Sequence, residues 1–109
     1  MAYDERLAER VRDMLGGHAG VTERKMFGGI GFMLDGNMCC GVHGEELILR
    51  LGDEDAGAAL ADPHGRPFDV APRPMKGWVL MHQDALGSDD ELRRWVEPAV
   101  EFASSLPPK

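Results

Sequence analysis

The sequence predicts a two-layer α+β domain, an antiparallel sheet with helices on one face, in the order α-β-β-β-α-β-β-α. Three observations support this fold class. A helical pattern of apolar residues stands at each end of the chain, and apolar segments joined by short turns fill residues 25–51. A proline-rich stretch at 62–77 then precedes one more apolar segment. Strands joined by short turns pair antiparallel, and the helices cover one face of the sheet they form.

Residues 3–15 are expected to form the first helix. Leu7, Val11 and Met14 or Leu15 recur at helical spacing and share one side of it, while charged residues occupy the remainder. Two consecutive glycines follow and are typical of a helix end.

The next segment predicts three strands, at about 25–34, 37–43 and 47–51. Asp35-Gly36 between the first two is typical of a tight hairpin turn, because both central residues of such a turn need positive φ. Glycines at 28, 29 and 31 predict that the first strand is strongly bent or bulged.

The second half of the chain predicts a short helix at 53–61, an extended edge segment at Arg66–Val70 and a strand at 78–82. The last helix begins at Ser88, which with Glu91 forms a capping-box pattern. Pro98 lies inside this helix and predicts a kink, because it removes one backbone hydrogen bond.

Length and composition predict a single domain spanning residues 1–109. The formal charge is −7, with nineteen acidic against twelve basic residues, so direct binding to nucleic acid is disfavoured. The chain has no apolar run of the roughly 20 residues that a membrane span needs. The N-terminal residues lack the pattern of a signal peptide, so we expect a cytoplasmic protein without membrane contact.

The residues predict no enzyme, cofactor or metal site. The glycines around position 29 lack the spacing of a phosphate-binding loop, and no nucleophile motif is present. Cys39 and Cys40 are neighbours on a predicted strand, so alternation predicts one buried and one partly exposed free thiol. Metal binding by Cys39, Cys40 and His43 at the strand end stays open as an alternative.

The candidate interaction residues are Arg24, Lys25, Arg73, Lys76 and Trp78. With Arg50 and Arg66 they would make a local basic patch on an acidic protein. The alternative is that Trp78 belongs to the core, that Lys76 is solvated, and that the nearby prolines only shape the connection.

The chain resembles the N-terminal domain of the TfoX/Sxy family of bacterial competence regulators. The matching pieces are Lys25-Met26-Phe27-Gly28-Gly29-Ile30-Gly31, Asp35-Gly36 with Met38, Leu47-Ile48-Leu49-Arg50, Pro67-Phe68, Met75-Lys76-Gly77-Trp78, and Leu92 with Trp95. The resemblance implies an α+β domain also related to secretion-chaperone-like folds, and a role as an adaptor of transcription. Because the sequence ends at Lys109, we expect a single-domain member without the C-terminal helical domain of full-length regulators.

Two functions follow as hypotheses. The first is a non-enzymatic regulatory module that binds a protein partner. The second is a small-ligand or metal-binding domain with redox-sensitive cysteines. The exposed edge predicted near Arg66–Val70 would also permit a homodimer.

Overall fold

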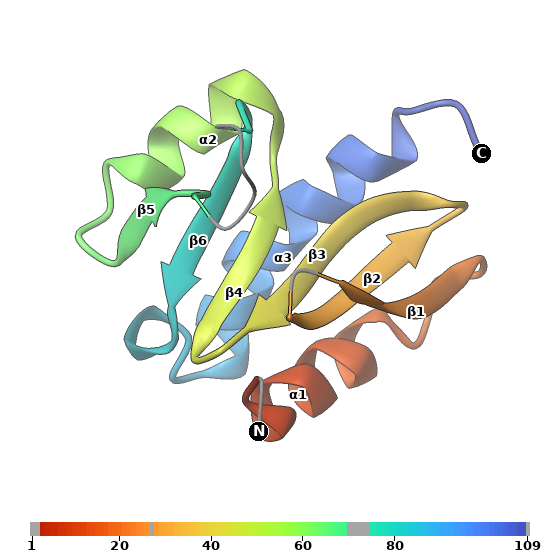
Figure 1. The fold of residues 1–109 in the computed structure, drawn as a ribbon. Coiled ribbons are helices and arrows are strands. Elements are labelled where there is room, and N and C mark those ends of the chain that lie inside the picture. Colours follow the sequence, from red (N-terminus) through yellow and green to blue (C-terminus); the bar gives the residue numbers. More distant parts are fainter. Residues whose placement is uncertain (1–2, 27, 70–74, 109) are drawn as a thin grey trace.

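The computed structural model describes residues 3–26, 28–69 and 75–108 (Figure 1). The helices are α1 (Glu5–Leu15), α2 (Gly52–Leu60) and α3 (Asp89–Ser104), with a short 3₁₀ turn, η1, at Gln83–Ala85. The strands are β1 (Val21–Met26), β2 (Gly29–Leu34), β3 (Asn37–His43), β4 (Glu46–Arg50), β5 (Gly65–Pro67) and β6 (Trp78–His82). The described strands form one antiparallel sheet in the order β1-β2-β3-β4-β6-β5.

The predicted α+β fold is confirmed, and helices and strands alternate in the expected pattern. The predicted strand at 25–34 is in fact two strands, β1 and β2, which adds one strand to the sheet. Gly28 has a φ of 74° and lies in the connection between them. The clustered glycines therefore allow the chain to reverse there, which is a sharper change than the bend or bulge expected from the sequence.

The β2–β3 hairpin forms as predicted. Asp35 and Gly36 have φ values of 51° and 86°, the left-handed conformations that a two-residue turn of this kind requires. A bulge follows in β3, because Met38 pairs with Met33 whereas Cys40 pairs with Phe32, which leaves Cys39 as an extra residue.

The main core lies between the sheet and the helices. Alternate residues of the central strands, such as Phe32, Val42 and Leu49, are fully buried against Val11 of α1 and Ala99 of α3. Figure 1 shows α3 running behind the sheet and α1 below it. Burial of these apolar side chains is the main term that stabilises the domain.

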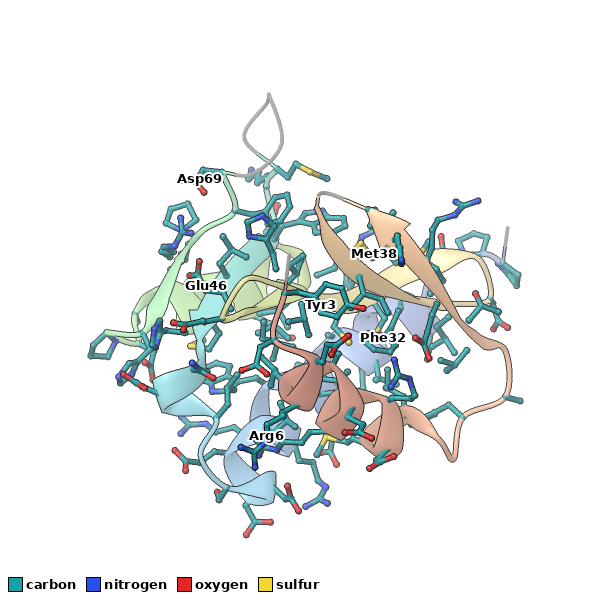
Figure 2. All side chains as sticks on the ribbon, turned by 60° about the horizontal axis from the view of Figure 1, so that its bottom comes forward. Tyr3, Arg6, Phe32, Met38, Glu46 and Asp69 are labelled. Atoms are coloured by element: carbon teal, nitrogen blue, oxygen red, sulfur yellow. The ribbon has the colours of Figure 1, made fainter. Side chains whose placement is uncertain are left out.

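The opposite face of the sheet carries a second, smaller apolar cluster. Met38, Ile48, Phe68 and Leu80 are buried there, and four partly buried residues surround them: Met26, Met33, Met75 and Trp78. Figure 2 shows the side chains from the side of α1, with Met38 and Phe32 labelled on the β1–β3 part of the sheet. Methionine is flexible and fills irregular surfaces, so this face is packed mainly by adaptable side chains.

The predicted start of the last helix is confirmed. The Ser88 hydroxyl accepts a hydrogen bond from the Glu91 backbone N–H at 3.1 Å, and the Ser88 backbone N–H donates to the Glu91 carboxylate at 3.3 Å, so the capping box is present. α3 continues through Pro98 to Ser104 as one helix, and the kink expected at Pro98 stays a prediction. β5 lies at the sheet edge as expected, but it is shorter than the segment predicted at Arg66–Val70: it ends at Pro67, and Val70 lies outside the described residues. Among the described helices, none has both the length and the apolar character needed to cross a bilayer.

Candidate functional site

The candidate interaction residues divide into two groups. Lys76 and Trp78 lie at the start of β6, whereas Arg24 and Lys25 lie on β1, with β2, β3 and β4 between them. At about 4.8 Å per strand spacing, the two groups are separated by roughly 19 Å across the sheet. Arg73 lies outside the described residues. The four described candidates therefore form two separate surfaces.

Lys76 and Trp78 border an apolar pocket beside α2. The pocket has a volume of about 490 Å³. Ala56 and Leu60 of α2 form one wall, and Phe68 and Trp78 form part of another. Leu60 is 43% exposed, which is unusual for a large apolar side chain of this protein. The pocket thus joins exposed apolar surface to a cation at its rim.

Trp78 is fixed in its position by two aromatic contacts. Its ring lies 5.5 Å from the ring of Phe68, centroid to centroid, and the Arg50 guanidinium lies 5.4 Å from its centroid. The Arg50 guanidinium also lies 5.5 Å from the ring of Phe102 on α3. Such cation–π contacts fix both partners. Trp78 is therefore a half-buried wall of the pocket and not a freely projecting anchor.

Lys76 projects into solvent at the same pocket. Its side chain is 87% exposed, and its Nζ lies 3.5 Å from the Asp53 carboxylate at the start of α2. An ion pair between two exposed side chains contributes little to stability. Lys76 is therefore available to an incoming anionic group at small cost.

Arg24 and Lys25 point to opposite faces of the sheet. Met26 joins the methionine-rich cluster and Glu23 bonds to Arg12 of α1, so alternation places Arg24 with Met26 and Lys25 with Glu23. The four residues from 22 to 25 are all exposed. Within the described part of the chain, the side chains of Arg24 and Lys25 make no hydrogen bond or ion pair, although their backbones pair with β2.

Arg50 and Arg66 do not extend a basic patch. Arg50 is engaged by the aromatic rings described above. Arg66 donates to Glu46 at 2.8 Å and to Asp69 at 2.8 Å, and these hydrogen bonds, led by that to Glu46, raise the pKa of Arg66. The positive charge of Arg66 is thus balanced by two carboxylates within the protein.

Both cysteines are buried, which corrects the prediction that one would be partly exposed. Cys39 and Cys40 are 2% and 0% exposed, and both belong to the core on the helix side. The reason is the bulge at Cys39, which breaks strict alternation and directs two neighbouring side chains to one face. Hydrogen bonding to Cys39, together with burial, raises the pKa of the Cys40 thiol, so it is a poor nucleophile at neutral pH.

His43 does not approach these thiols. Val42 points into the core, so His43, the next residue of β3, points to the other face of the sheet. In the described ranges, no group of three or more His, Cys, Asp or Glu residues is placed to hold a metal ion.

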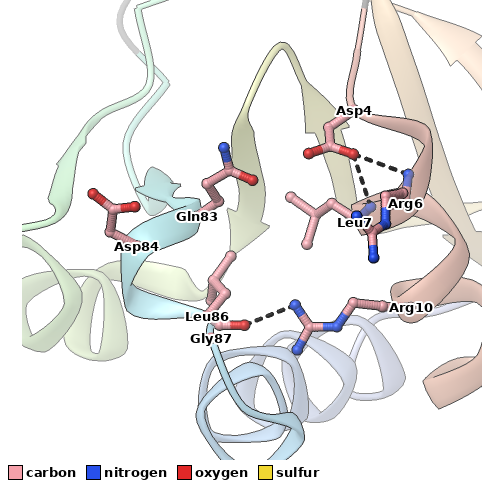
Figure 3. A pocket seen from close by; sticks show the side chains of 8 residues that line it. All are labelled: Asp4, Arg6, Leu7, Arg10, Gln83, Asp84, Leu86 and Gly87. Carbon is pink, nitrogen blue, oxygen red and sulfur yellow. Dashed lines mark hydrogen bonds between the residues drawn. The ribbon is translucent and has the colours of Figure 1, made fainter.

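A polar pocket of about 400 Å³ lies between the start of α1 and η1 (Figure 3). Of its charged side chains, Asp4, Arg10 and Asp84 are already engaged in the fold, whereas the Arg6 side chain has no hydrogen bond or ion pair among the described residues. Asp4 caps α1 by accepting from the backbone N–H groups of Arg6 and Leu7, and Arg10 donates to the Leu86 carbonyl at 2.7 Å. Asp84, on the far side, contacts His82 at 3.4 Å. These contacts tie α1 to the loop before α3, a structural role.

Comparison with protein families identifies the chain. The family model described as the TfoX N-terminal domain matches residues 11–103. The chain belongs to the TfoX N-terminal domain family. Comparison with curated proteins and with solved structures gives no significant match. Membership agrees with the resemblance seen in the sequence around Met26 and Gly29, the residues at which β1 ends and β2 begins in this TfoX N-terminal domain.

Sequence reasoning missed two features of the candidate surfaces. The first is the contribution of α2, whose Leu60 was not among the predicted interaction residues although an apolar residue at the end of an acidic helix is visible in the sequence. The second is that β1 lies at the edge of the sheet. Arg24 and Lys25 were singled out as cations, but no local pattern indicates which strand lacks a neighbour.

Proposed function

We propose that this TfoX N-terminal domain is a non-enzymatic regulatory module that acts by binding another protein. The observation that carries the proposal is the outer edge of β1, which pairs with no described strand and whose exposed residues include two cations without an acidic partner in the described chain. An uncovered strand edge offers backbone donors and acceptors to an incoming chain, which is a common mode of protein recognition. Membership of a family of competence regulators supports a regulatory purpose for such binding.

The test places a photo-crosslinking amino acid at Thr22, an exposed β1 residue, in the source cell. We expect one protein to be crosslinked there and not from Glu101, an exposed position on α3. The captured protein is then purified, and its binding to the unmodified domain is measured by calorimetry. If no captured protein binds the purified domain with defined stoichiometry, the proposal of a protein-binding module is wrong.

A second candidate function, binding of a small molecule, is favoured by the pocket beside α2. An apolar molecule with one carboxylate would place its body against Leu60 and Phe68 and its charge near Lys76. Native mass spectrometry with decanoate tests this, with Lys76→Gln as the matched variant. A mass increase that Lys76→Gln weakens would support ligand binding, and absence of any bound decanoate would count against it.

A further inference from the structure

β1 is the long, regular edge of the sheet. Its six residues pair with β2 in continuous register, with no bulge between them. The opposite edge, β5, has three residues and contains Pro67, which has no N–H to donate. Natural sheets protect their edges by shortening, bulging, proline or cover. β5 is protected in this way, whereas β1 keeps the geometry that another strand needs for pairing (Figure 1).

The charges of β1 set what that strand can carry. Glu23 is already neutralised, because Arg12 donates to its two oxygens at 2.6 and 2.8 Å. Arg24 and Lys25 remain without a partner in the described chain and point to opposite faces of the sheet. The edge therefore presents one cation above the sheet and one below it, at consecutive positions.

We propose that β1 accepts an extended segment of the partner protein that carries two consecutive acidic residues. The inference rests on the proposed function and names the chemistry of the partner. Consecutive residues of a strand point to opposite faces, so an adjacent acidic pair reaches both cations at once. Backbone hydrogen bonds to β1 provide most of the affinity, and the two ion pairs select the sequence and its register.

A second copy of this chain is a poor occupant of the same edge. Suppose that two copies pair antiparallel through β1 and keep their helices on the same side of the joint sheet. The residue at the centre of the paired segment then lies directly opposite the same residue of the other copy. The registers with the greatest overlap of β1 centre on Glu23 or on Arg24. The register centred on Glu23 sets Arg24 and Lys25 opposite Thr22 and Val21, so neither cation gains an acidic partner. The register centred on Arg24 sets two arginines directly opposite one another, which is destabilising, and offers Lys25 only a Glu23 that Arg12 already holds. Self-pairing therefore satisfies the two cations less well than an acidic segment does.

The test uses five capped, fluorescently labelled hexapeptides and the full chain at low salt. The first is Thr-Val-Glu-Glu-Val-Thr, with adjacent acids, and the second replaces both acids with lysine. The third, Thr-Glu-Val-Glu-Val-Thr, has the same charge but places both acids on one face. The fourth and fifth have the first sequence with every second backbone nitrogen methylated, one peptide for each of the two alternating sets of nitrogens. Binding is followed by fluorescence anisotropy.

We expect the adjacent-acid peptide to bind roughly tenfold more tightly than the lysine peptide, and severalfold more tightly than the one-face peptide. Only one of the two methylated peptides should lose binding, because only every second N–H group of a paired strand faces its neighbour. The variant Arg24→Glu/Lys25→Glu should invert the preference for acid over lysine. The control Arg6→Glu/Arg94→Glu, at two exposed positions outside β1, has the same net charge and should keep the preference of the unmodified chain.

Several results would overturn the inference. These are absence of binding by every peptide, equal binding of the acidic and lysine peptides, or displacement of the acidic peptide by single-stranded DNA of the same charge. A dimer of this chain that the charge reversal dissolves would show that the edge takes a second copy instead. If the captured cellular partner binds the β1 reversal variant as well as the unmodified domain, the acidic-strand inference fails while the protein-binding function stands.

Discussion

Gly29→Ala should destabilise the domain strongly, although the change adds only one methyl group. A methyl at this position would lie 2.0 Å from the Val42 carbonyl oxygen on the neighbouring strand. Ordinary contacts between non-bonded heavy atoms need roughly 3.5 Å, so β2 and β3 would have to separate by more than an ångström. Overpacking of this kind lowers the free energy of unfolding by about 1–3 kcal/mol. Replacing a strand glycine by alanine raises it by about 0.5–1 kcal/mol, because alanine loses less conformational entropy on folding. We expect a net loss of about 2 kcal/mol.

Gly31→Ala is the matched control on the same strand and the same face. Its methyl group would lie 2.6 Å from the Met26 sulfur and 3.3 Å from the Met38 methyl group. Both obstacles are ends of flexible side chains, and a change of rotamer relieves the overlap. The cost of moving them is offset by the gain from removing a strand glycine, so the free energy of unfolding should change by less than about 1 kcal/mol.

Urea unfolding of the two variants decides the question. With a slope of about 1–3 kcal/mol per molar urea, a loss of 2 kcal/mol lowers the midpoint by roughly 1 M for Gly29→Ala. The midpoint of Gly31→Ala should stay near that of the unmodified chain. A midpoint for Gly31→Ala equal to or below that of Gly29→Ala would refute the argument that the carbonyl contact, and not loss of glycine itself, sets the cost.

Three further predictions concern thiols, pH and helix capping. Cys39 and Cys40 should resist a thiol reagent such as DTNB in the native state and react in denaturant, because both are buried; fast native reaction of either would contradict this. The hydrogen bond from Arg12 lowers the pKa of Glu23, so their ion pair stabilises the fold above the unfolded pKa of about 4.3 and this is lost as pH falls through the lowered pKa. Glu23→Gln should therefore cost at most ~1 kcal/mol at pH 7 and nothing at strongly acidic pH, measured by urea unfolding at both, and an equal loss at both would exclude the linkage. Ser88→Ala should lower stability by about 1 kcal/mol through loss of the α3 cap, and an unchanged thermal midpoint would argue against that cap.

The sequence predicted most elements because local signals determine them. The turn at Asp35 needs left-handed backbone, and the last helix begins where Ser88 can cap it. It did not predict the reversal between β1 and β2, since a run of glycines permits a bend, a bulge or a turn equally well. Which of these forms depends on pairing with strands far along the chain.

The cysteines illustrate the same limit. Alternation is a property of one strand, whereas a bulge is a property of a strand pair. Here Cys39 is the extra residue between the pairs Met33–Met38 and Phe32–Cys40, and this bulge directs both thiols into the core. For the candidate surfaces, the sequence indicated the cations but not their arrangement. Lys76 meets α2, whereas Arg24 and Lys25 lie on β1, because strand order and not chain order determines neighbours.

The position of β1 in the sheet determines how its cations can take part in binding. On a strand with neighbours on both sides, Arg24 and Lys25 would act only through their side chains, as a weak and salt-sensitive patch. At an edge, the same residues flank backbone groups that another chain can bind, so charge and hydrogen bonding act on one segment together. Arg12 holds the Glu23 carboxylate, so Glu23 does not compete with an incoming acidic segment for Arg24 and Lys25.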